Sequence, residues 1–368
     1  FGGRFELRFA VWTAWCAAAF VFFSCVSLEI AWRRQIRRMS ATPTILNFPE
    51  AELELDQLLG AGAFGQVWKC RVRNRRMADV EGRRGREDVW KAVKLVRQQD
   101  MGMAVEEAQK MQRAVRVARP DFVPMFWFCS MGTKDDRGRV SEVLGICMEC
   151  IDGTSLSTVR RHKEFNHRMA CVVLKDLCYG LGRLHEHGIV HNDVKDDNIL
   201  VTPVGECYLC DFGVSLFLED YPAGTEMPTT GTPHYMSPEI FFPYDMVRYD
   251  TKVDIWALGI VGYELAVGCN PWQPDPFTPV HGRDMMFATL EDIEFMDLSR
   301  IPRDLSFHGP EGPYARLLHR CFEVMPQLRA SVTELLNEFQ WVLSQVGPEE
   351  RELLGRKCAE ARIMEASR

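Results

Sequence analysis

The longest run of apolar positions along the chain covers residues 9–28, which contain neither a charged residue nor a proline. A helix of about 20 apolar residues is long enough to cross the hydrocarbon core of a bilayer. Tryptophans lie towards both ends of the run, and four arginines follow within residues 33–38. Because tryptophans favour the membrane interface and positive residues favour the cytoplasmic side, the pattern predicts a single-pass membrane protein with a cytoplasmic C-terminal part. A cleaved signal peptide or a buried core helix explains a run of this length less well.

Beyond Pro49 the apolar positions change their spacing. Short runs typical of strands, broken by glycines, include residues 66–72 and 89–96, and helical periodicity follows, most clearly in residues 169–187. The chain therefore divides into a short extracytosolic N-terminus (1–8), a transmembrane helix (9–28), a basic juxtamembrane linker (29–52), one folded domain (53–346) with a strand-rich lobe (53–150) and a helix-rich lobe (151–346), and a charged tail (347–368). Because apolar residues are sparse in the tail, we expect an exposed helix or a frayed end there.

Composition narrows the possible classes of protein. The chain is 46% hydrophobic and 26% charged, which is typical of globular proteins. Its net charge of -7 argues against a nucleic-acid partner, because binding to phosphates requires a basic surface. The 13 cysteines are odd in number and irregularly spaced, which favours reduced thiols over a framework of disulfides.

Three glycines mark the first candidate binding element. Gly60, Gly62 and Gly65 follow one strand-like segment and precede another. Glycines in such a position allow backbone amides to close over phosphate oxygens without a clash from a Cβ atom. A dinucleotide-binding fold would need a helix directly after the glycines, and a P-loop would need a terminal Gly-Lys-Ser/Thr. Neither is present, so the pattern favours a strand hairpin that covers a nucleotide.

Further motifs follow the glycines in a fixed order. They are AVK at 92–94, a helical glutamate at Glu107, HNDVKDDN at 191–198, DFG at 211–213 and SPE at 237–239. With this ordered set, the chain from Leu53 to about Gln345 resembles the eukaryotic protein kinase family. The segments ICMECIDGTSL, CDFGVS and GTPHYMSPE are similar to the MAP kinase kinases of the Ste group. The resemblance implies an α+β, two-lobed kinase fold and ATP with Mg²⁺ as cofactors.

The same resemblance implies catalytic roles for individual residues. Phosphoryl transfer requires positioning and neutralisation of charge rather than covalent help. Asp193 would accept the proton of the substrate hydroxyl, and Lys195 would neutralise the transferring phosphoryl group, which is the family's mark of serine/threonine specificity. Lys94 would hold the phosphates. Asn198 and Asp211 would bind the metal ions.

The remaining predicted site residues surround the nucleotide. Glu107 would orient Lys94 through an ion pair, and it is preferred over the adjacent Glu106 because Met111, one turn later, marks the side of the helix that faces inward. The residues expected to surround the nucleotide itself are Leu59, Gly60, Gly62, Gly65, Val67, Ala92, Met148, Glu149, Ile151 and Leu200. The resemblance further implies two structural contacts, a bond from Asp254 to the catalytic-loop backbone and a buried ion pair of Glu239 with Arg329.

Two departures from the family pattern concern regulation. Asn192 replaces the arginine that commonly clamps a phosphorylated activation loop. Pro228 occupies the position where relatives carry the activating phosphosite, and Thr229 and Thr230 follow it. We therefore expect activity that does not depend on phosphorylation of this loop.

Residues 37–48 offer a candidate docking motif. They combine two arginines, a short spacer and the apolar pair Leu46 and Phe48, so they look like a MAP kinase docking peptide, although arginines beside a membrane span need no second purpose. The sequence as a whole predicts a membrane-anchored serine/threonine protein kinase that acts on a protein substrate. The alternative is a pseudokinase or scaffold that binds partners without transferring phosphate.

Overall fold

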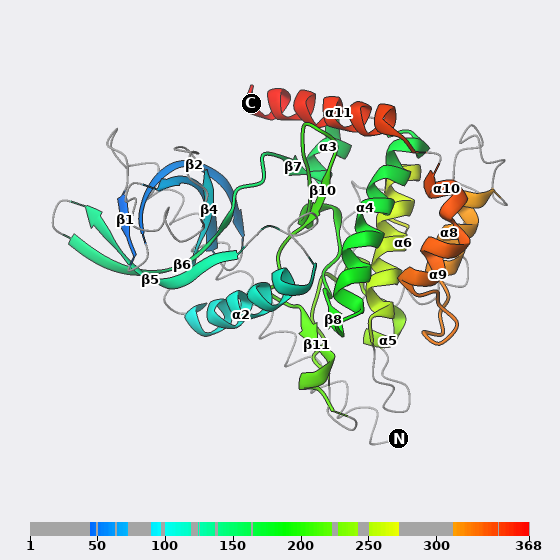
Figure 1. Ribbon diagram of the computed structural model, residues 1–368, viewed down its shortest axis with the longest axis horizontal. Helices are drawn as coiled ribbons and strands as arrows, with labels where there is room; N and C mark the ends of the chain where they lie inside the picture. The colour runs from blue at the N-terminus through cyan, green and yellow to red at the C-terminus, as the bar shows by residue number, and fades with distance from the viewer. Residues whose placement is uncertain are drawn as a thin grey trace, which may run out of the picture. The chain divides into compact units, whose positions relative to one another are not determined.

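The computed structural model describes residues 45–48, 51–62, 65–72, 90–96, 100–118, 124, 126–136, 139–162, 165–222, 227–241, 250–271, 312–344 and 346–367 (Figure 1). The chain separates into two compact units. The first comprises Phe1–Met101 with Cys129–Cys147, and the second comprises Gly102–Phe128 with Met148–Arg368. This division into a strand-rich and a helix-rich unit confirms the predicted kinase-like fold class.

The first unit is built from strands that close into a barrel in the order β1-β2-β3-β4-β6-β5. Their bounds are β1 Ile45–Asn47, β2 Glu52–Gly62, β3 Gly65–Val72, β4 Lys91–Val96, β5 Phe126–Asp136 and β6 Arg139–Glu149. Alternate side chains of a strand point to opposite faces, so apolar residues gather inside the barrel. Leu53, Cys70, Val93 and Ile146 are fully buried there.

The predicted docking motif is wrong in its apolar half. Ile45–Asn47 forms β1, which pairs antiparallel with both β2 and β5 and closes the barrel. Leu46 is 1% exposed and Phe48 is 7% exposed, so neither side chain is available to a partner. Alternating apolar residues suit a peptide groove and a half-buried strand equally well, and here the barrel interior takes them. Residues 37–44 lie outside the described residues.

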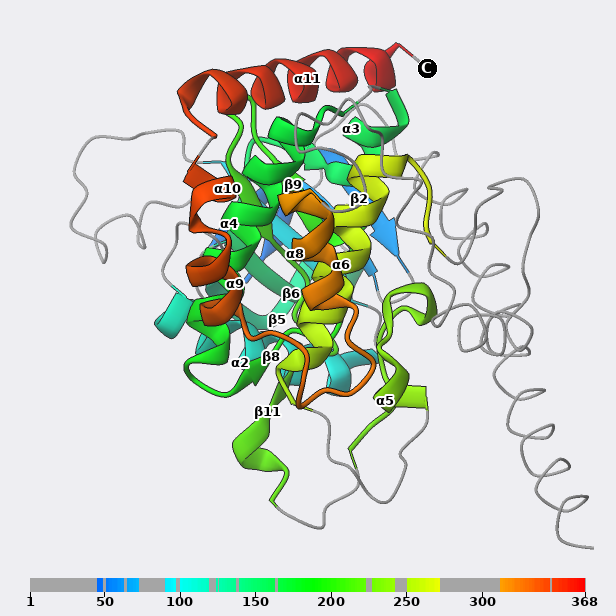
Figure 2. The same ribbon diagram turned by 90° about the vertical axis from the view of Figure 1, so that its right-hand side faces the viewer.

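The second unit is organised around α6 (Lys252–Val267). Every residue from Val253 to Leu265 is buried, as expected for a helix that is apolar on all sides. The other helices are α2 Met101–Ala118, α3 Leu156–His162, α4 His167–His185, α5 Pro238–Phe241, α8 Pro313–Cys321, α9 Val332–Glu338, α10 Gln340–Ser344 and α11 Pro348–Ala366. Helices α4 and α8 pack on α6, and α9 and α10 pack on α4 (Figure 2).

Short strands carry the loops of the second unit. A three-stranded sheet has the order β10-β9-β7, and a two-stranded sheet joins β11 to β8. Their bounds are β7 Thr154–Ser155, β8 Ile189–Val190, β9 Ile199–Val201, β10 Cys207–Leu209 and β11 Leu216–Phe217, and the 3-10 turns are η3 Asp196–Asn198, η4 Leu218–Asp220 and η5 Pro233–Tyr235. The predicted motifs at 191–198 and 211–213 occupy the connections between these strands.

The charged tail differs from the exposed helix or frayed end that its composition suggested. It forms α11, which lies against α3, α4 and β9 (Figure 1). Leu354, Cys358 and Ala361 are fully buried, and a Cβ atom on Gly355 would lie 2.2 Å from the carbonyl oxygen of Pro203. Small residues on one side of α11 therefore allow the helix to pack closely on the rest of the unit, although its sequence contains few large apolar residues.

The prediction of a single-pass membrane protein is corrected. In the ranges that the structure describes, no helix is long and apolar enough to cross a bilayer. Residues 9–28, on which the predicted transmembrane helix rests, lie outside those ranges. The structure therefore contradicts the membrane localisation as far as it describes the chain, and we withdraw it.

Candidate active site

Three side chains surround the carboxylate of Asp193, and two of them belong to the catalytic-loop segment at 191–198. Lys195 Nζ donates to Asp193 Oδ2 at 2.7 Å and to Thr232 Oγ1 at 2.7 Å, and Thr232 in turn donates to Asp193 Oδ1 at 2.6 Å. Asn198 Nδ2 donates to the same Oδ2 at 2.8 Å and to the Asp193 carbonyl at 2.9 Å. Both carboxylate oxygens are thus oriented by donors. Thr232 is a member of this site from outside the segment.

These donors also set the charge of the carboxylate. Burial on its own would raise the pKa of Asp193, but the hydrogen bonds from Lys195 and Thr232 and the charge of Lys195 outweigh it, so the pKa lies below its ordinary value. Asp193 is therefore ionised at neutral pH. A proton acceptor in this state is what transfer from a hydroxyl group requires.

His191 is neutral. Complete burial is the main cause that lowers its pKa. The Asp193 N–H donates to His191 Nδ1 at 3.4 Å, and Nε2 lies 3.2 Å from the carbonyl oxygen of Cys210. These partners assign the proton to Nε2, because Nδ1 accepts and a carbonyl can only accept. The histidine thereby joins the catalytic loop to the strand end that precedes Asp211.

Asp254, in the first turn of α6, bonds the backbone of the catalytic loop. Its carboxylate accepts from the backbone N–H of His191 at 2.9 Å and of Asn192 at 2.8 Å, and it lies 2.8 Å from His185 Nε2. Asp254 is 1% exposed, so these donors compensate for the loss of its hydration. The expected bond to the catalytic-loop backbone is confirmed.

The DFG segment turns sharply at Asp211. This residue has φ 68, in the left-handed region, and its side chain is exposed, whereas Phe212 is 2% exposed. The Phe212 ring meets the His191 ring edge-on with centroids 5.0 Å apart. A buried anchor next to an uncommon backbone conformation directs the Asp211 carboxylate away from the core.

The donor set at this place fits a magnesium ion. Asp211 contributes an exposed carboxylate. Both hydrogen bonds that the Asn198 side chain donates use Nδ2, so its amide oxygen is the atom left for a cation. Carboxylate and amide oxygens are the ligands that Mg²⁺ prefers.

Helix α2 supplies the predicted glutamate. Glu107 is 8% exposed, and a Cβ atom on Gly213 would lie 3.7 Å from its Oε2. Glu106, in contrast, is exposed and forms an i,i+4 ion pair with Lys110 at 2.9 Å. Lys110 also donates to the Gly213 carbonyl at 3.3 Å. The burial of Glu107 next to the DFG glycine supports its choice over Glu106, and its pairing with Lys94 stays a prediction.

The remaining predicted residues fall into two sets. In the barrel, Gly60 pairs with Val67 and Gly62 pairs with Gly65 across the β2–β3 hairpin, and Val67 pairs with Lys94 of β4. Leu59 and Ala92 belong to these strands, and Leu59 is 47% exposed. In the helical unit, Met148, Glu149 and Ile151 lie at and just after the end of β6, and Leu200 lies in β9. Their roles towards a nucleotide stay predictions.

The ion pair predicted between Glu239 and Arg329 is present. Arg329 donates to both carboxylate oxygens, at 2.6 and 3.0 Å, and it is 1% exposed. Its remaining N–H groups reach the carbonyls of Lys252, Glu323 and Val324. The guanidinium therefore fixes the segment that begins α5 to the loop between α8 and α9.

One polar cluster was not predicted. Arg160 of α3 forms ion pairs with Asp196 and with Glu264, and the Tyr235 hydroxyl donates to Asp196 at 3.1 Å and to Glu264 at 2.9 Å. Burial is the main cause that raises the pKa of Glu264 to about 7, and Arg160 and the hydrogen bond from Asn270 oppose it. The members lie far apart along the chain, so no local spacing could have indicated the cluster. It packs beside the catalytic loop, since Asp196 directly follows Lys195.

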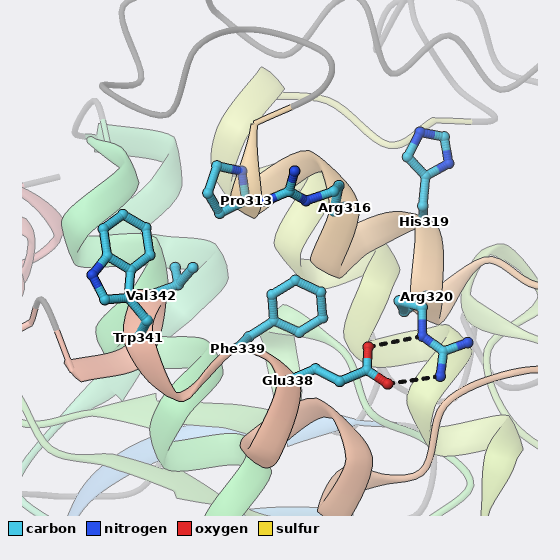
Figure 3. Close-up of a pocket in the computed structure, with 8 residues that line it drawn as sticks. All are labelled: Pro313, Arg316, His319, Arg320, Glu338, Phe339, Trp341 and Val342. Atoms are coloured by element: carbon cyan, nitrogen blue, oxygen red, sulfur yellow. Dashed lines mark hydrogen bonds and ion pairs between the residues drawn. The ribbon is translucent and has the colours of Figure 1, made fainter.

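A separate hollow of about 480 Å³ lies between α8 and the α9–α10 pair (Figure 3). Glu338 accepts from Arg320 at one end, at 3.1 and 3.0 Å, and Trp341 is 58% exposed at the other. None of the predicted catalytic or nucleotide-binding residues line it. It is therefore distinct from the candidate active site.

Comparison with known proteins agrees with this geometry. The family model described as protein kinase domain matches residues 53–342. The chain is 37% identical over 195 residues to the serine/threonine-protein kinase KIC1 of Saccharomyces cerevisiae. This alignment covers 52% of this chain and 16% of KIC1. It is 32% identical over 197 residues to the MAP kinase kinase kinase mkh1 of Schizosaccharomyces pombe. This alignment covers 53% of this chain and 17% of mkh1.

A longer alignment has lower identity. The chain is 29% identical over 282 residues to the serine/threonine-protein kinase sid1 of Schizosaccharomyces pombe, covering 76% of this chain and 51% of that protein. The chain thus spans about half of sid1 and about a sixth of KIC1 and mkh1. These similarities confirm the resemblance to Ste-type kinases that the motifs indicated.

Proposed function

Because the chain belongs to the protein kinase family, we propose that it transfers the γ-phosphate of ATP to serine and threonine hydroxyls of proteins. The observation that carries the proposal is the Asp193 carboxylate held by Lys195 and Thr232, with Asn198 bound to the same group. A fold kept only for binding partners has no need of this arrangement. The pseudokinase alternative is therefore not favoured.

Each residue of the arrangement has a part in the transfer. Asp193 accepts the proton of the attacking hydroxyl, and its lowered pKa keeps it ionised for that purpose. Lys195 holds Asp193 in place and brings a positive charge to the transferring group. Thr232 fixes the second carboxylate oxygen, so the acceptor cannot rotate away from the substrate.

The nucleotide requires further residues. Asp211 and Asn198 would hold magnesium, which when bound neutralises charge on the phosphates. Lys94 would hold the α and β phosphates, and backbone amides of the hairpin at Gly60, Gly62 and Gly65 would cover them. We expect the side chains of Leu59, Val67, Ala92, Met148 and Leu200 to contact the adenine, and the backbone at Glu149 and Ile151 to form hydrogen bonds with it.

The names of the relatives support a proposal for the substrate class. Two of the matched proteins carry the name MAP kinase kinase kinase or a variant of it, and several others carry the name serine/threonine-protein kinase. We place this chain in the same kind of cascade, with a protein kinase as its substrate. Lys195 supports serine and threonine as the acceptors.

The test is a phosphate-transfer assay with the whole chain, labelled ATP and Mg²⁺. A generic protein and a catalytically inactive MAP kinase kinase serve as the two substrates. Asp193→Asn serves as the inactive variant, and Glu186→Gln, at an exposed position after α4, serves as the matched control. We expect transfer by the parent and by Glu186→Gln only. Equal transfer by Asp193→Asn, or none by a folded parent, would reject the function.

A further inference from the structure

Asn192 stands where the family places an arginine, and its side chain bonds the activation segment, residues 214–236 between the DFG and SPE motifs. Its side-chain Nδ2 donates to the Thr230 hydroxyl at 2.8 Å, to the Thr230 carbonyl at 3.2 Å and to the Val214 carbonyl at 3.4 Å. Because two of these acceptors are carbonyl oxygens, the amide must present its nitrogen to the segment. The contact is therefore made by a neutral donor to an unmodified threonine.

The position of Asn192 is tightly determined. The residue has φ 65 and is 8% exposed, and its backbone N–H donates to Asp254 at 2.8 Å. In the described chain its Oδ1 is buried without a hydrogen-bond partner. The side chain thus contributes only its donor, and the fixed backbone allows it little room to follow a displaced segment.

The Thr230 contact is continuous with the catalytic carboxylate. Gly231 has φ 119, and a Cβ atom there would lie 2.5 Å from the Asn192 carbonyl oxygen, so the segment lies directly on the catalytic loop. Thr232 comes next and donates to Asp193. Displacement at Thr230 would therefore move the donor that orients the proton acceptor.

The surroundings of Thr230 do not suit a phosphate group. It would add close to two negative charges and three acceptor oxygens. Within the part of the chain that the structure describes, no arginine or lysine bonds the Thr230 side chain, and one neutral amide cannot compensate such a group. Thr232, two residues further along the chain, bonds both Asp193 and Lys195, so a segment displaced at Thr230 would disturb that arrangement directly. Thr230 is only half-buried, which leaves its hydroxyl within reach of another kinase.

We propose that Thr230 is an inhibitory phosphorylation site. Transfer of a phosphoryl group from ATP to Thr230 Oγ forms the new P–O bond, breaks the bond to the leaving ADP and releases the hydroxyl proton to the base of the modifying kinase. The product loses the Asn192 contact and with it the alignment of Thr232 and Asp193. This inference rests on the proposed function. Where an arginine clamp is present, phosphorylation of the loop raises activity, whereas here it would lower activity.

The test compares a carboxylate at two adjacent positions of the whole chain. Thr230→Glu should lower kcat/KM at least about tenfold. Thr229→Glu should stay within about twofold, because Thr229 is exposed and the hydrogen bonds donated by the Asn192 side chain go to Thr230 and Val214. Phosphatase-treated parent should keep its activity, and phosphothreonine incorporated at position 230 should reproduce the loss. A parent-like or higher rate for Thr230→Glu would overturn the proposal.

A second measurement does not depend on activity. Amide hydrogen exchange across residues 227–232 should be faster in Thr230→Glu than in the parent, and unchanged in Thr229→Glu. If parent and Thr229→Glu transfer no phosphate while exchange changes as expected, the proposed function fails and the inferred contact stands. Equal exchange in both variants would overturn the inference whatever the activity.

Discussion

At the scale of the residue, the charge next to Asp193 matters most. Replacing Lys195 by Met removes the donor to both Asp193 and Thr232 and leaves the acceptor carboxylate without its cation. We expect kcat to fall by ~10² to 10³, the usual effect of losing one electrostatic group in an active site. Steady-state phosphate transfer at saturating ATP measures it.

The matched control for this change is Lys357→Met, on α11, which removes a lysine from a surface helix. It should keep kcat within about twofold. Thermal unfolding of both variants shows whether either has lost its fold. A folded Lys195→Met with parental kcat would contradict the role given to this lysine.

Glu264 makes stability depend on pH. Its pKa is raised from 4.5 to about 7, chiefly by burial, so the folded state binds a proton that the unfolded state has lost between those values. The Glu264 contribution is fully present below about pH 4.5 and is lost as the pH rises through about 7. Relative to Glu264→Gln, the parent should lose up to about 1.4 kcal/mol of unfolding free energy per pH unit in this window.

Denaturant unfolding at several pH values between 4.5 and 7.5 tests this expectation. The difference in unfolding free energy between parent and Glu264→Gln carries the signal, because the other titrating groups contribute equally to both chains. A difference that stays constant, or that changes in favour of the parent as the pH rises, would contradict it.

The contacts of Lys195 and Asn198 with Asp193 could be predicted, because the three residues belong to one contiguous motif. The roles of these residues and of Asp211 towards a nucleotide and metal stay predictions. The cluster around Glu264 could not be predicted, because its members meet only through packing of distant helices and loops. Thr230 as the partner of Asn192 was likewise hidden, since the sequence indicates the missing arginine but not the atom that the amide contacts.

At the scale of the element, α11 depends on few apolar residues and on ionic contacts. Arg351 donates to both Asp176 oxygens at 2.7 Å and to the Gly205 carbonyl at 2.9 Å. Asp176 is 6% exposed, so Arg351→Ala leaves a buried carboxylate without its cation. We expect a loss of about 2 kcal/mol of unfolding free energy, less than for a fully buried pair because Arg351 is partly exposed.

The control is Arg356→Ala, which removes an exposed arginine one and a half turns further along the same helix. Its unfolding free energy should stay within about 0.5 kcal/mol of the parent. Chemical denaturation of both variants gives the comparison. Equal losses would show that the Asp176 contact adds nothing beyond the loss of a surface arginine.

Elements were predicted where the periodicity was strong. The strand at 66–72 and the helix at 169–187 correspond to β3 and α4 within one or two residues at most of their ends. The burial of α11 was missed because its contact side is made of small residues. Leu46 and Phe48 were misassigned because the same alternation serves a docking peptide and a strand that closes a barrel.

At the scale of the whole molecule, the fold of the helical unit depends on joining segments far apart in the chain. Arg329→Met removes the only cation bonded to Glu239 in the described residues, and it leaves three backbone carbonyls without this donor. Breaking such a buried pair costs about 3–5 kcal/mol. Arg316→Met, at an exposed position of α8, should cost far less.

The Arg329 guanidinium also lies 5.1 Å from the Trp256 ring centroid, so the substitution removes a contact of that ring as well. Chemical denaturation should unfold Arg329→Met at a lower denaturant concentration than the parent. Parental unfolding of the variant would contradict the structural weight given to the pair.

Helix α11 begins after residue 342, where the match to the kinase family ends. A stop codon placed between the two would leave every catalytic motif intact and would look harmless in a survey of coding variants. The shortened polypeptide would nevertheless expose the surface around Asp176 and the turn at Pro203 that α11 covers. Such a late truncation should act through cellular quality control, with normal messenger levels and little protein.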